Sequence, residues 1–352
     1  MKIGIICHDA FPIAQPFQGG LEMITFLIVK ELHHRGHEVT SLCLKGSTLP
    51  GNMVYYEEIE SAEDNLEYQL EEVAAVSKSL NNFLLRDFDV VQNHSLHYQS
   101  IILGNISHHN FITTFHTPVF SFLKVAIDVV ASNVRQQFIG VSDCISDLYG
   151  KTLPKVNTIY NGIDLTIWKP KFEVTEGFYY SWSGRICKEK GLDELMGLCL
   201  KEDITLKIAG PISDTDYFES QIKPLLTLDN FEYVGHLHQK ELNEFIKKSR
   251  GYIFSSIWEE PYGLVIAEAL ACGVPVLANK VGAAPEILER KSGFLFDIKN
   301  LESFKQGLNY IDSLSRRDCR NRAENFCSHH SMVDKYEALY AQMSSKYLEK
   351  AV

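Results

Sequence analysis

Two glutamates, Glu260 and Glu268, are separated by seven residues and differ in their surroundings. Glu260 lies in the turn-like segment 258–262, whereas Glu268 interrupts an otherwise apolar run over 263–278. A carboxylate in such a run costs free energy unless it is paired or binds a ligand. Carboxylates that face a ligand accept hydrogen bonds from sugar or ribose hydroxyls. Glu268 is therefore either a ligand-binding group or the structural partner of a neighbouring Arg or Lys.

The same segment also offers backbone donors. Tyr262-Gly263-Leu264 opens the apolar run, and its pattern predicts a helix over 263–272. The N–H groups at Gly263 and Leu264 would then lie at a helix N-terminus, where they can bind phosphate.

A second candidate is the basic segment Gly184-Arg185-Ile186-Cys187-Lys188-Glu189-Lys190-Gly191. It follows a predicted strand over 179–183, at the edge of an α/β sheet where ligands bind. Arg185 can hold phosphate oxygens in a fork, and Lys190 adds a point charge. On spacing alone, an ordinary solvated basic loop is the favoured interpretation.

A third candidate is Gln18-Gly19-Gly20-Leu21-Glu22, between a predicted strand and a predicted helix. Gly19 and Gly20 would let the backbone approach a ligand closely, beside the free N–H groups of a helix N-terminus. A tight strand-to-helix turn explains the pair equally well. The chain contains neither GxGxxG nor GxxxxGK[ST].

Several sequence patterns resemble metal-binding motifs, but none of them indicates a metal site. Asp214-Thr215-Asp216 and Asp87-Phe88-Asp89 match a DxD metal motif, but Asp214 is placed to cap a helix. Histidine pairs occur without a Cys or carboxylate at a known ligand spacing, and there is no HExxH. We expect no dedicated metal site and no cofactor. The histidine pairs are His33-His34, His94 with His97, His108-His109, His236 with His238, and His329-His330.

The elements that must position these residues alternate between short β-branched runs and longer stretches of helical period. This alternation predicts an α/β fold of parallel sheets with helices on both faces. The series restarts after Asn161-Gly162-Ile163-Asp164, and 165–176 is linker-like. We therefore expect two doubly wound domains, 1–164 and 165–331, facing a central cleft. The expected strands are 3–7, 38–44, 89–92, 111–115, 138–141, 155–160, 179–183, 204–209, 231–234, 252–254, 274–278 and 293–296; the helices include 20–35, 66–86, 238–248, 263–272 and most of 300–349.

The composition and charge of the chain limit which kinds of partner it can bind. The chain has 352 residues, long enough for about two domains, with 45% apolar and 22% charged residues. Its net charge of −11 excludes general nucleic-acid binding but not an anionic small ligand held by local cations. No apolar stretch is long and clean enough for a membrane anchor. The eight cysteines form no CxxC pair, so we expect reduced thiols and a cytoplasmic protein.

The combined motifs resemble those of the retaining glycosyltransferases of family 4 (glycosyl transferases group 1), which have the GT-B fold. The resemblance rests on the Gly19-Gly20 turn, on Gly184-Arg185 with Lys190-Gly191, and on Glu260 with Glu268. The surrounding segments fit as well: Glu260-Pro261-Tyr262-Gly263-Leu264, Glu268-Ala269-Leu270-Ala271-Cys272-Gly273-Val274-Pro275-Val276, Phe115-His116-Thr117-Pro118, Val141-Ser142 and Asn161-Gly162-Ile163-Asp164.

The resemblance implies roles for the donor. The second domain would bind a nucleotide-diphosphate sugar, most often a UDP-sugar and next a GDP-sugar. Arg185 and Lys190 would neutralise the diphosphate, which Gly19 and Gly20 would approach. Glu260 would bind sugar hydroxyls and Glu268 the ribose, with Tyr262, Gly263 and Leu264 also at the donor. His116 would contact the sugar near its reacting carbon.

The resemblance also implies a metal-independent, hexosyltransferase-type enzyme that uses front-face attack and no protein nucleophile. The first domain would bind the acceptor, which is a sugar, a lipid-linked molecule or a small molecule. The final helix, about 332–352, would pack back on that domain. Two alternatives remain open: a nucleotide-sugar epimerase of the same fold, and a non-catalytic nucleotide-sugar binding protein. Product analysis separates transfer from epimerisation, and binding without turnover would favour the second alternative.

Overall fold

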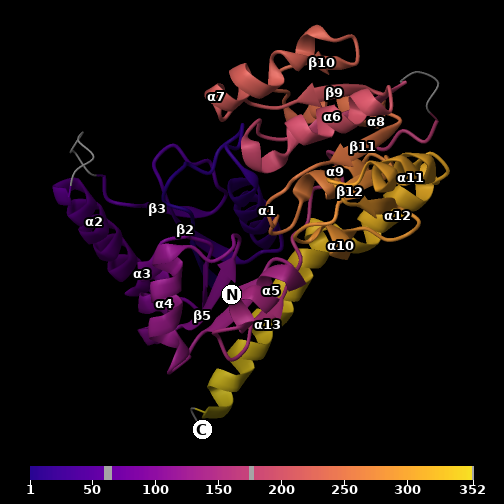
Figure 1. Ribbon diagram of the computed structural model, residues 1–352. Helices are drawn as coiled ribbons and strands as arrows, with labels where there is room; N and C mark the ends of the chain where they lie inside the picture. Colours follow the sequence, from indigo (N-terminus) through magenta and orange to yellow (C-terminus); the bar gives the residue numbers. More distant parts are fainter. Residues whose placement is uncertain (59–65, 174–177, 351–352) are drawn as a thin grey trace. The chain divides into compact units, whose positions relative to one another are not determined.

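The computed structural model describes residues 1–58, 66–173 and 178–350, and it divides the chain into two compact units (Figure 1). The first unit is Met1–Tyr160 with His330–Val352, and the second is Asn161–His329. The sequence placed the divisions after residue 164 and near residue 332. Part of the predicted linker, 174–176, and the last two residues of the predicted final helix lie outside the described residues.

The first unit holds a seven-stranded sheet in which all neighbouring strands run parallel. Its order is β3-β2-β1-β4-β5-β6-β7, so the chain reverses direction across the sheet between β1 and β4. In doubly wound sheets, ligands bind outside the carboxyl ends of the strands at this reversal. The strands are β1 (Lys2–Ile6), β2 (Glu38–Cys43), β3 (Asn52–Tyr55), β4 (Val90–Asn93), β5 (Asn110–Phe115), β6 (Gln137–Gly140) and β7 (Asn157–Thr158).

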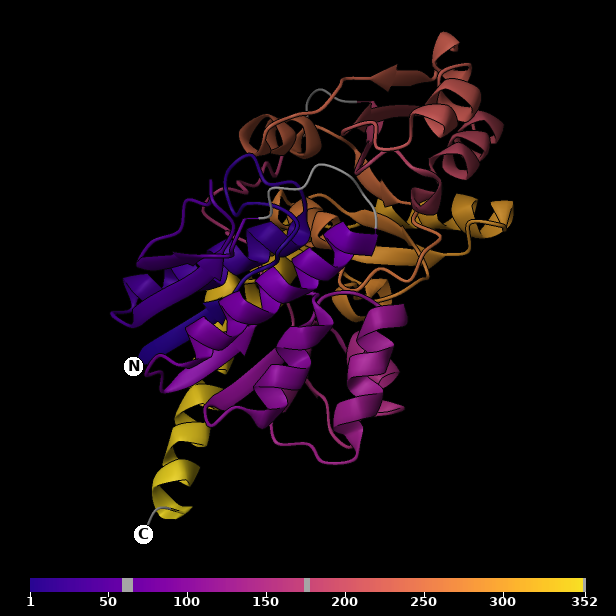
Figure 2. The same cartoon turned by 90° about the vertical axis from the view of Figure 1, so that its left-hand side faces the viewer.

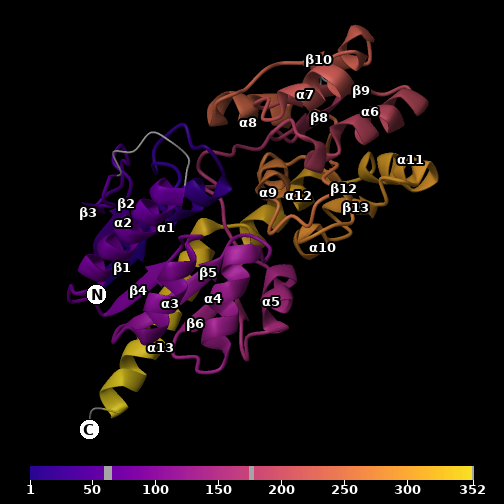
Figure 3. The same cartoon turned by 60° about the vertical axis from the view of Figure 1, so that its left-hand side comes forward.

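Helices cover both faces of this sheet (Figure 3). Because side chains alternate along a strand, Val91 and Phe111 pack in the cluster that includes Leu80 and Phe83 of α2. Gln92 and Thr114 face the opposite side. The helices of the unit are α1 (Gly20–His34), α2 (Leu66–Leu84), α3 (Tyr98–Ile106), α4 (Ser121–Ala131), α5 (Asp143–Gly150) and the C-terminal α13 (His329–Lys350).

The C-terminal helix α13 returns to the first unit (Figure 2), where its tyrosines contact Gln92 and Thr114. Tyr340 donates a hydrogen bond to Gln92, and the Tyr336 hydroxyl lies 3.4 Å from Thr114 Oγ1. Arg35, directly after α1, adds ion pairs to two carboxylates of α13. The final helix is thus part of the first unit.

The second unit repeats the same topology with six parallel strands in the order β10-β9-β8-β11-β12-β13. The reversal here lies between β8 and β11. The strands are β8 (Tyr179–Ser183), β9 (Thr205–Ala209), β10 (Phe231–Tyr233), β11 (Gly251–Phe254), β12 (Val276–Asn279) and β13 (Gly293–Phe296). The helices are η1 (Lys188–Lys190), α6 (Leu192–Lys201), α7 (Thr215–Tyr217), η2 (Phe218–Ile222), η3 (Leu225–Thr227), α8 (Gln239–Lys247), α9 (Leu264–Ala271), α10 (Ala284–Ile287), α11 (Leu301–Ile311) and α12 (Arg316–Phe326).

The predicted α/β class with two doubly wound sheets is confirmed, but strand β3 and helices α3 and α5 were not predicted. Strand β3 is short and half exposed, so it lacks the apolar run by which a buried strand is recognised. Helix α3 has a strand-like sequence, YQSIILGNI, and its N-cap is His97, whose ring accepts a hydrogen bond from Gln99 N. Among the described residues, no helix is long and apolar enough to cross a membrane.

Candidate active site

An ion pair joins the two loops that flank the strand reversal of the second unit. Lys190 follows β8 and Glu260 follows β11, and the Lys190 ammonium contacts Glu260 Oε1. The same oxygen accepts a hydrogen bond of 3.1 Å from Ser256 Oγ. Both charged side chains are largely buried, at 18% and 12% exposure. The pair therefore stands where a doubly wound sheet binds its ligand.

Backbone contacts hold the two loops together at this place. Ile257 N donates to Glu189 O at 3.0 Å, and Ser255 Oγ donates to Lys190 O at 2.7 Å. Gly191 makes the close approach possible, because a Cβ there would lie 2.5 Å from Ser255 O, and its φ of +60° disfavours other residues. Lys190 thus has little freedom to leave the loop after β11.

The turn after β12 donates hydrogen bonds to the loop that carries Glu260. Ala283 N donates to Glu260 O at 3.0 Å, and Gly282 N donates to Glu259 Oε2 at 2.7 Å. A Cβ on Gly282 would lie 2.3 Å from Glu260 O, and the φ of Gly282 is +52°. Only glycine fits this turn without moving the glutamate.

Glu268 lies in α9 with 7% of its surface exposed. Among the described residues, its carboxyl group has no hydrogen-bond or ion-pair partner, so the structure does not favour the alternative in which Glu268 pairs with a neighbouring Arg or Lys. Burial raises the pKa of Glu268 to about 8, because the charged form loses its hydration. At neutral pH the group is mostly protonated, and it can both donate and accept a hydrogen bond.

The sequence predicted that helix α9 begins at residue 263, and it begins one residue later, at Leu264. Gly263 is its N-cap, and in the part of the chain that the structure describes the N–H groups of Gly263 and Leu264 have no acceptor. Tyr262, just before them, is buried. The helix N-terminus therefore offers two free donors to an anion.

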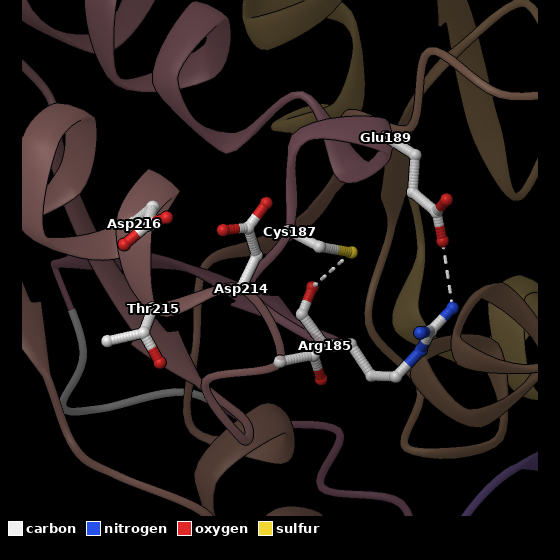
Figure 4. Close-up of a pocket in the computed structure, with 7 residues that line it drawn as sticks. Arg185, Cys187, Glu189, Asp214, Thr215 and Asp216 are labelled. Atoms are coloured by element: carbon white, nitrogen blue, oxygen red, sulfur yellow. Dashed lines mark hydrogen bonds and ion pairs between the residues drawn. The ribbon is translucent and has the colours of Figure 1, made fainter. Parts of the chain in front are cut away.

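Arg185 lies apart from the Lys190–Glu260 pair. Its guanidinium donates to Glu189 at 2.8 Å and is 53% exposed. It lines a cavity of about 450 Å³ together with both aspartates of the DxD motif (Figure 4). Asp214 accepts a hydrogen bond from Tyr217 N at 2.9 Å and so caps α7, as predicted.

The first unit places a histidine pair at the carboxyl ends of β4 and β5, beside its own strand reversal. His116, which follows β5, lies 2.8 Å from His94, which follows β4 (His94 Nδ1 to His116 Nε2). Both rings are buried. Burial lowers the pKa of His94 to about 3 and the pKa of His116 well below its usual value, so neither ring is charged at neutral pH.

Acidic groups lie beside the Gly19-Gly20 turn. His8 Nε2 is 3.7 Å from Glu22 Oε1, and His8 Nδ1 is 3.4 Å from Asp9 Oδ1. Burial pushes the pKa of Asp9 up, but the hydrogen bond with His8 and the nearby His97 outweigh it and lower the pKa. Gly19 is the extended N-cap of α1, which begins at Gly20.

Two family models match consecutive parts of the chain. The model of glycosyl transferases group 1 matches residues 166–326, and the model of Glycosyltransferase Family 4 matches residues 18–167. The chain belongs to the group 1 glycosyltransferases of family 4.

Relatives and solved structures agree with this assignment. The glycosyltransferase is 26% identical to spore coat protein SA of Bacillus subtilis, over 92% of each chain, and 23% identical to N-acetyl-alpha-D-glucosaminyl L-malate synthase of Bacillus anthracis, over 97% of this chain and 96% of that protein. Sucrose-phosphate synthase of Thermosynechococcus elongatus has the same fold, with a TM-score of 0.79 at 15% identity, over 98% of this chain and 99% of that chain. Anabaena Alr3699/HepE, in complex with UDP and glucose, superposes with a TM-score of 0.74 at 17% identity, over 97% and 99%. The likeness shows the GT-B fold.

The sequence of this glycosyltransferase singled out Lys190, Glu260 and Glu268 as candidates, but not the groups that contact Lys190 and Glu260. Gly282 is distant in sequence from Glu260, and Ser256 lies four residues before Glu260 in a loop where no local pattern marks it. There was one weak indication for His94 in the sequence: it closely follows a predicted strand, as His116 does, so the two histidines could lie at the same edge of the sheet.

Proposed function

We propose that this glycosyltransferase moves a hexose from a nucleotide-diphosphate sugar to an acceptor hydroxyl, with retention of configuration and without a metal. The second unit binds the donor, and the first binds the acceptor, which is a sugar, a lipid-linked molecule or a small molecule. The observation that carries the proposal is Glu268: a buried carboxyl group without a protein partner costs free energy, which a bound ligand can offset.

The ribose of the donor suits Glu268. A protonated carboxyl group can accept a hydrogen bond from one ribose hydroxyl and donate one to the next. Both oxygens of the carboxyl group and both hydroxyls would then be hydrogen-bonded. The free N–H groups of Gly263 and Leu264 belong to the same element and suit the diphosphate. One helix, α9, thus supports both the ribose and the phosphate contacts in this proposal.

Lys190 and Arg185 neutralise the leaving diphosphate. Each is paired with a glutamate in the free unit, so the donor meets cations that are already positioned. Negative charge on the diphosphate grows as the bond to the sugar breaks, and the cations therefore stabilise the transition state more than the bound donor. Glu260 keeps its contact with Ser256 and turns its second oxygen to the sugar hydroxyls.

The reaction needs no protein nucleophile in this proposal. The acceptor oxygen attacks the anomeric carbon from the face that the diphosphate leaves, and the bond from that carbon to the phosphate oxygen breaks. The acceptor proton passes to the departing phosphate oxygen. Gly19 and Gly20 leave room for the diphosphate, and His116 contacts the sugar that is transferred.

UDP-sugars are the first donors to test, since Alr3699/HepE, of the same fold, has been crystallised with UDP and with UDP-glucose. GDP-sugars come next. All eight cysteines are free thiols, which favours a reducing compartment, and we propose that the enzyme acts in the cytoplasm.

Transfer to water tests the proposal before any acceptor is known. The protein is incubated with α-linked UDP- and GDP-sugars, and the released sugar is followed by proton NMR before it mutarotates. We expect slow release of nucleoside diphosphate with the α-anomer formed first. Initial formation of the β-anomer would contradict retention. Conversion of the donor into its epimer, without release of nucleoside diphosphate, would instead favour the epimerase.

A further inference from the structure

The histidine pair of the first unit links two neighbouring strands at the same edge of the sheet. Asn93 of β4 lies opposite Thr113 of β5, and each strand is followed closely by one of the two histidines. The rings stack obliquely, with centroids 5.1 Å apart and an angle of 39° between the ring planes. His94 N donates to Ile6 O of β1 at 2.8 Å, which fixes the position of its backbone. His94 is thus held by the sheet on the side away from His116.

The pair contains one hydrogen bond and two neutral rings. Each neutral imidazole carries a single N–H, so either His94 Nδ1 donates to His116 Nε2, or the reverse. One of the two N–H protons lies in the shared hydrogen bond, and the two arrangements differ in where the other proton lies. In the first, His116 carries its proton on Nδ1; in the second, His94 carries its proton on Nε2.

The surroundings of His94 distinguish the two arrangements. His94 Nε2 is fully buried and has no hydrogen-bond partner. The second arrangement would bury an N–H donor there without an acceptor, and orphaned buried N–H groups are rarer than orphaned acceptors. The first arrangement leaves only a bare lone pair at this position. Among the described residues, His8, which contacts Asp9 and Glu22, also acts electrostatically on His116.

We propose that His94 is a positioning residue that donates from Nδ1 to His116 and thereby keeps the proton of His116 on Nδ1. Within the described residues of the first unit, His116 Nδ1 has no hydrogen-bond partner, and unlike His94 Nε2 it is not fully buried. His116 therefore presents a hydrogen-bond donor to its ligand. A donor selects an oxygen with a free lone pair, such as a sugar oxygen or a phosphate oxygen.

This inference rests on the proposed function, because it specifies the contact that His116 makes with the sugar-nucleotide. Its structural part does not depend on activity. Selective ¹⁵N labelling of histidine and a long-range nitrogen–proton NMR spectrum of the full chain report which nitrogen of each ring is protonated. We expect His116 to be protonated on Nδ1 and His94 on Nδ1. A His116 protonated on Nε2 in the wild-type protein would overturn the proposal.

Two substitutions at His94 separate positioning from packing. In His94→Asn the amide nitrogen takes the place of Nδ1 and keeps the donor, whereas His94→Leu fills the space without one. We expect His116 to keep its tautomer in His94→Asn and to lose the preference in His94→Leu. Exposed His108→Leu is the matched control and leaves the His116 signals unchanged. An unchanged His116 tautomer in His94→Leu, with a native melting curve, would also overturn the proposal.

Donor hydrolysis adds a coupling measurement. Loss of a partner that orients a metal-ligating side chain typically costs about 10-fold to 100-fold in activity, and we take the same size for the group that orients His116. We expect a fall in kcat of that size in His94→Leu, recovery to within a few-fold in His94→Asn, and no further loss when His94→Leu is added to His116→Leu. Additive losses would mean that His94 acts independently of His116. If no variant or wild-type protein hydrolyses any donor, the proposed function fails while the NMR result stands by itself.

Discussion

Lys190 and Arg185 carry the positive charge of the proposed donor site, and they differ in burial. Lys190 is mostly buried against Glu260, whereas Arg185 is half exposed against Glu189. We expect Lys190→Ala and Arg185→Ala each to lower kcat by about 10²-fold to 10³-fold, because each removes a cation that stabilises the leaving diphosphate. Steady-state hydrolysis of the donor measures this.

A matched control for these variants is Lys207→Ala. Lys207 forms an ion pair with Glu232 in the same unit, away from the loops after β8 and β11. It should retain wild-type kinetics. Near wild-type turnover in both Lys190→Ala and Arg185→Ala would remove the diphosphate role from these residues.

Glu268 makes the second unit sensitive to pH. Its pKa is raised from about 4.5 to about 8 in the folded protein, so the folded state binds more protons than the unfolded state between these values. The free energy of unfolding therefore falls as the pH rises through this window, by an amount on the order of a few kcal/mol. Glu268→Gln removes the titration, and its gain in Tm over the wild type should grow from pH 5 to pH 9.

Melting curves of both proteins across this pH range test the expectation. Glu244→Gln, which breaks an exposed ion pair with Lys247, is the control and should show a pH-independent difference. A Tm difference between Glu268→Gln and wild type that stays constant with pH would mean that burial does not raise the pKa of Glu268. The account of its environment would then be wrong.

At the scale of elements, the turn after β12 fixes the loop that carries Glu260. Gly282→Ala places a methyl group against the Glu260 backbone at a positive φ, so the loop must move. We expect kcat to fall at least 10-fold, because a small displacement of a positioning group costs much in rate. Donor hydrolysis by the folded variant measures this.

Gly36→Ala is the matched control for this turn. Gly36 also has a positive φ, +85°, but a Cβ there meets nothing within 4 Å. It should lose about 1 kcal/mol of stability from backbone strain and keep its activity. Equal kinetic effects of the two substitutions would show that Gly282 acts through strain alone and not through Glu260.

Helix α7 tests whether the DxD motif has a chemical role. Asp214 caps this helix, so Asp214→Ala should cost about 1 kcal/mol of stability and leave kcat unchanged. Asp216→Asn should alter neither. Activity should survive EDTA, because cations and backbone donors suffice for the diphosphate in the proposed site. Loss of activity in EDTA that manganese restores would instead give the two aspartates a metal.

The sequence could predict those elements whose signals are local. The apolar run after Gly263, with its single glutamate, predicted both α9 and the unusual environment of Glu268. Strand β3 and helix α3 were missed, because an exposed edge strand has little apolar pattern and because α3 begins at a histidine cap. Gly282 acts through a tertiary contact and Ser256 through a loop conformation that no sequence pattern marks, so their place in the site required the structure.

At the scale of the whole molecule, both units share one strand order, apart from the additional β7 of the first, and each carries a candidate cluster at or beside the reversal of its own sheet. This repetition explains why short motifs far apart in the sequence predicted the fold. A strand, a loop and a helix recur, and the loops at the carboxyl ends of the strands carry the polar residues. The return of α13 to the first unit depends on contacts of Tyr336, Tyr340 and Arg35 that no local pattern indicates.

Binding of the donor by the whole chain tests the central claim most directly. Thermal unfolding is measured with UDP-, GDP- and ADP-sugars, since a ligand that binds only the folded state raises stability by RT ln(1 + [L]/Kd). At 100 times Kd the gain is about 2.7 kcal/mol, which shifts Tm by several degrees. The account predicts that one class of nucleotide sugar produces this shift in the wild type, and that Glu268→Ala and Lys190→Ala each greatly reduce it while Lys207→Ala keeps it. No shift with any nucleotide sugar, or a full shift in both Glu268→Ala and Lys190→Ala, would contradict it.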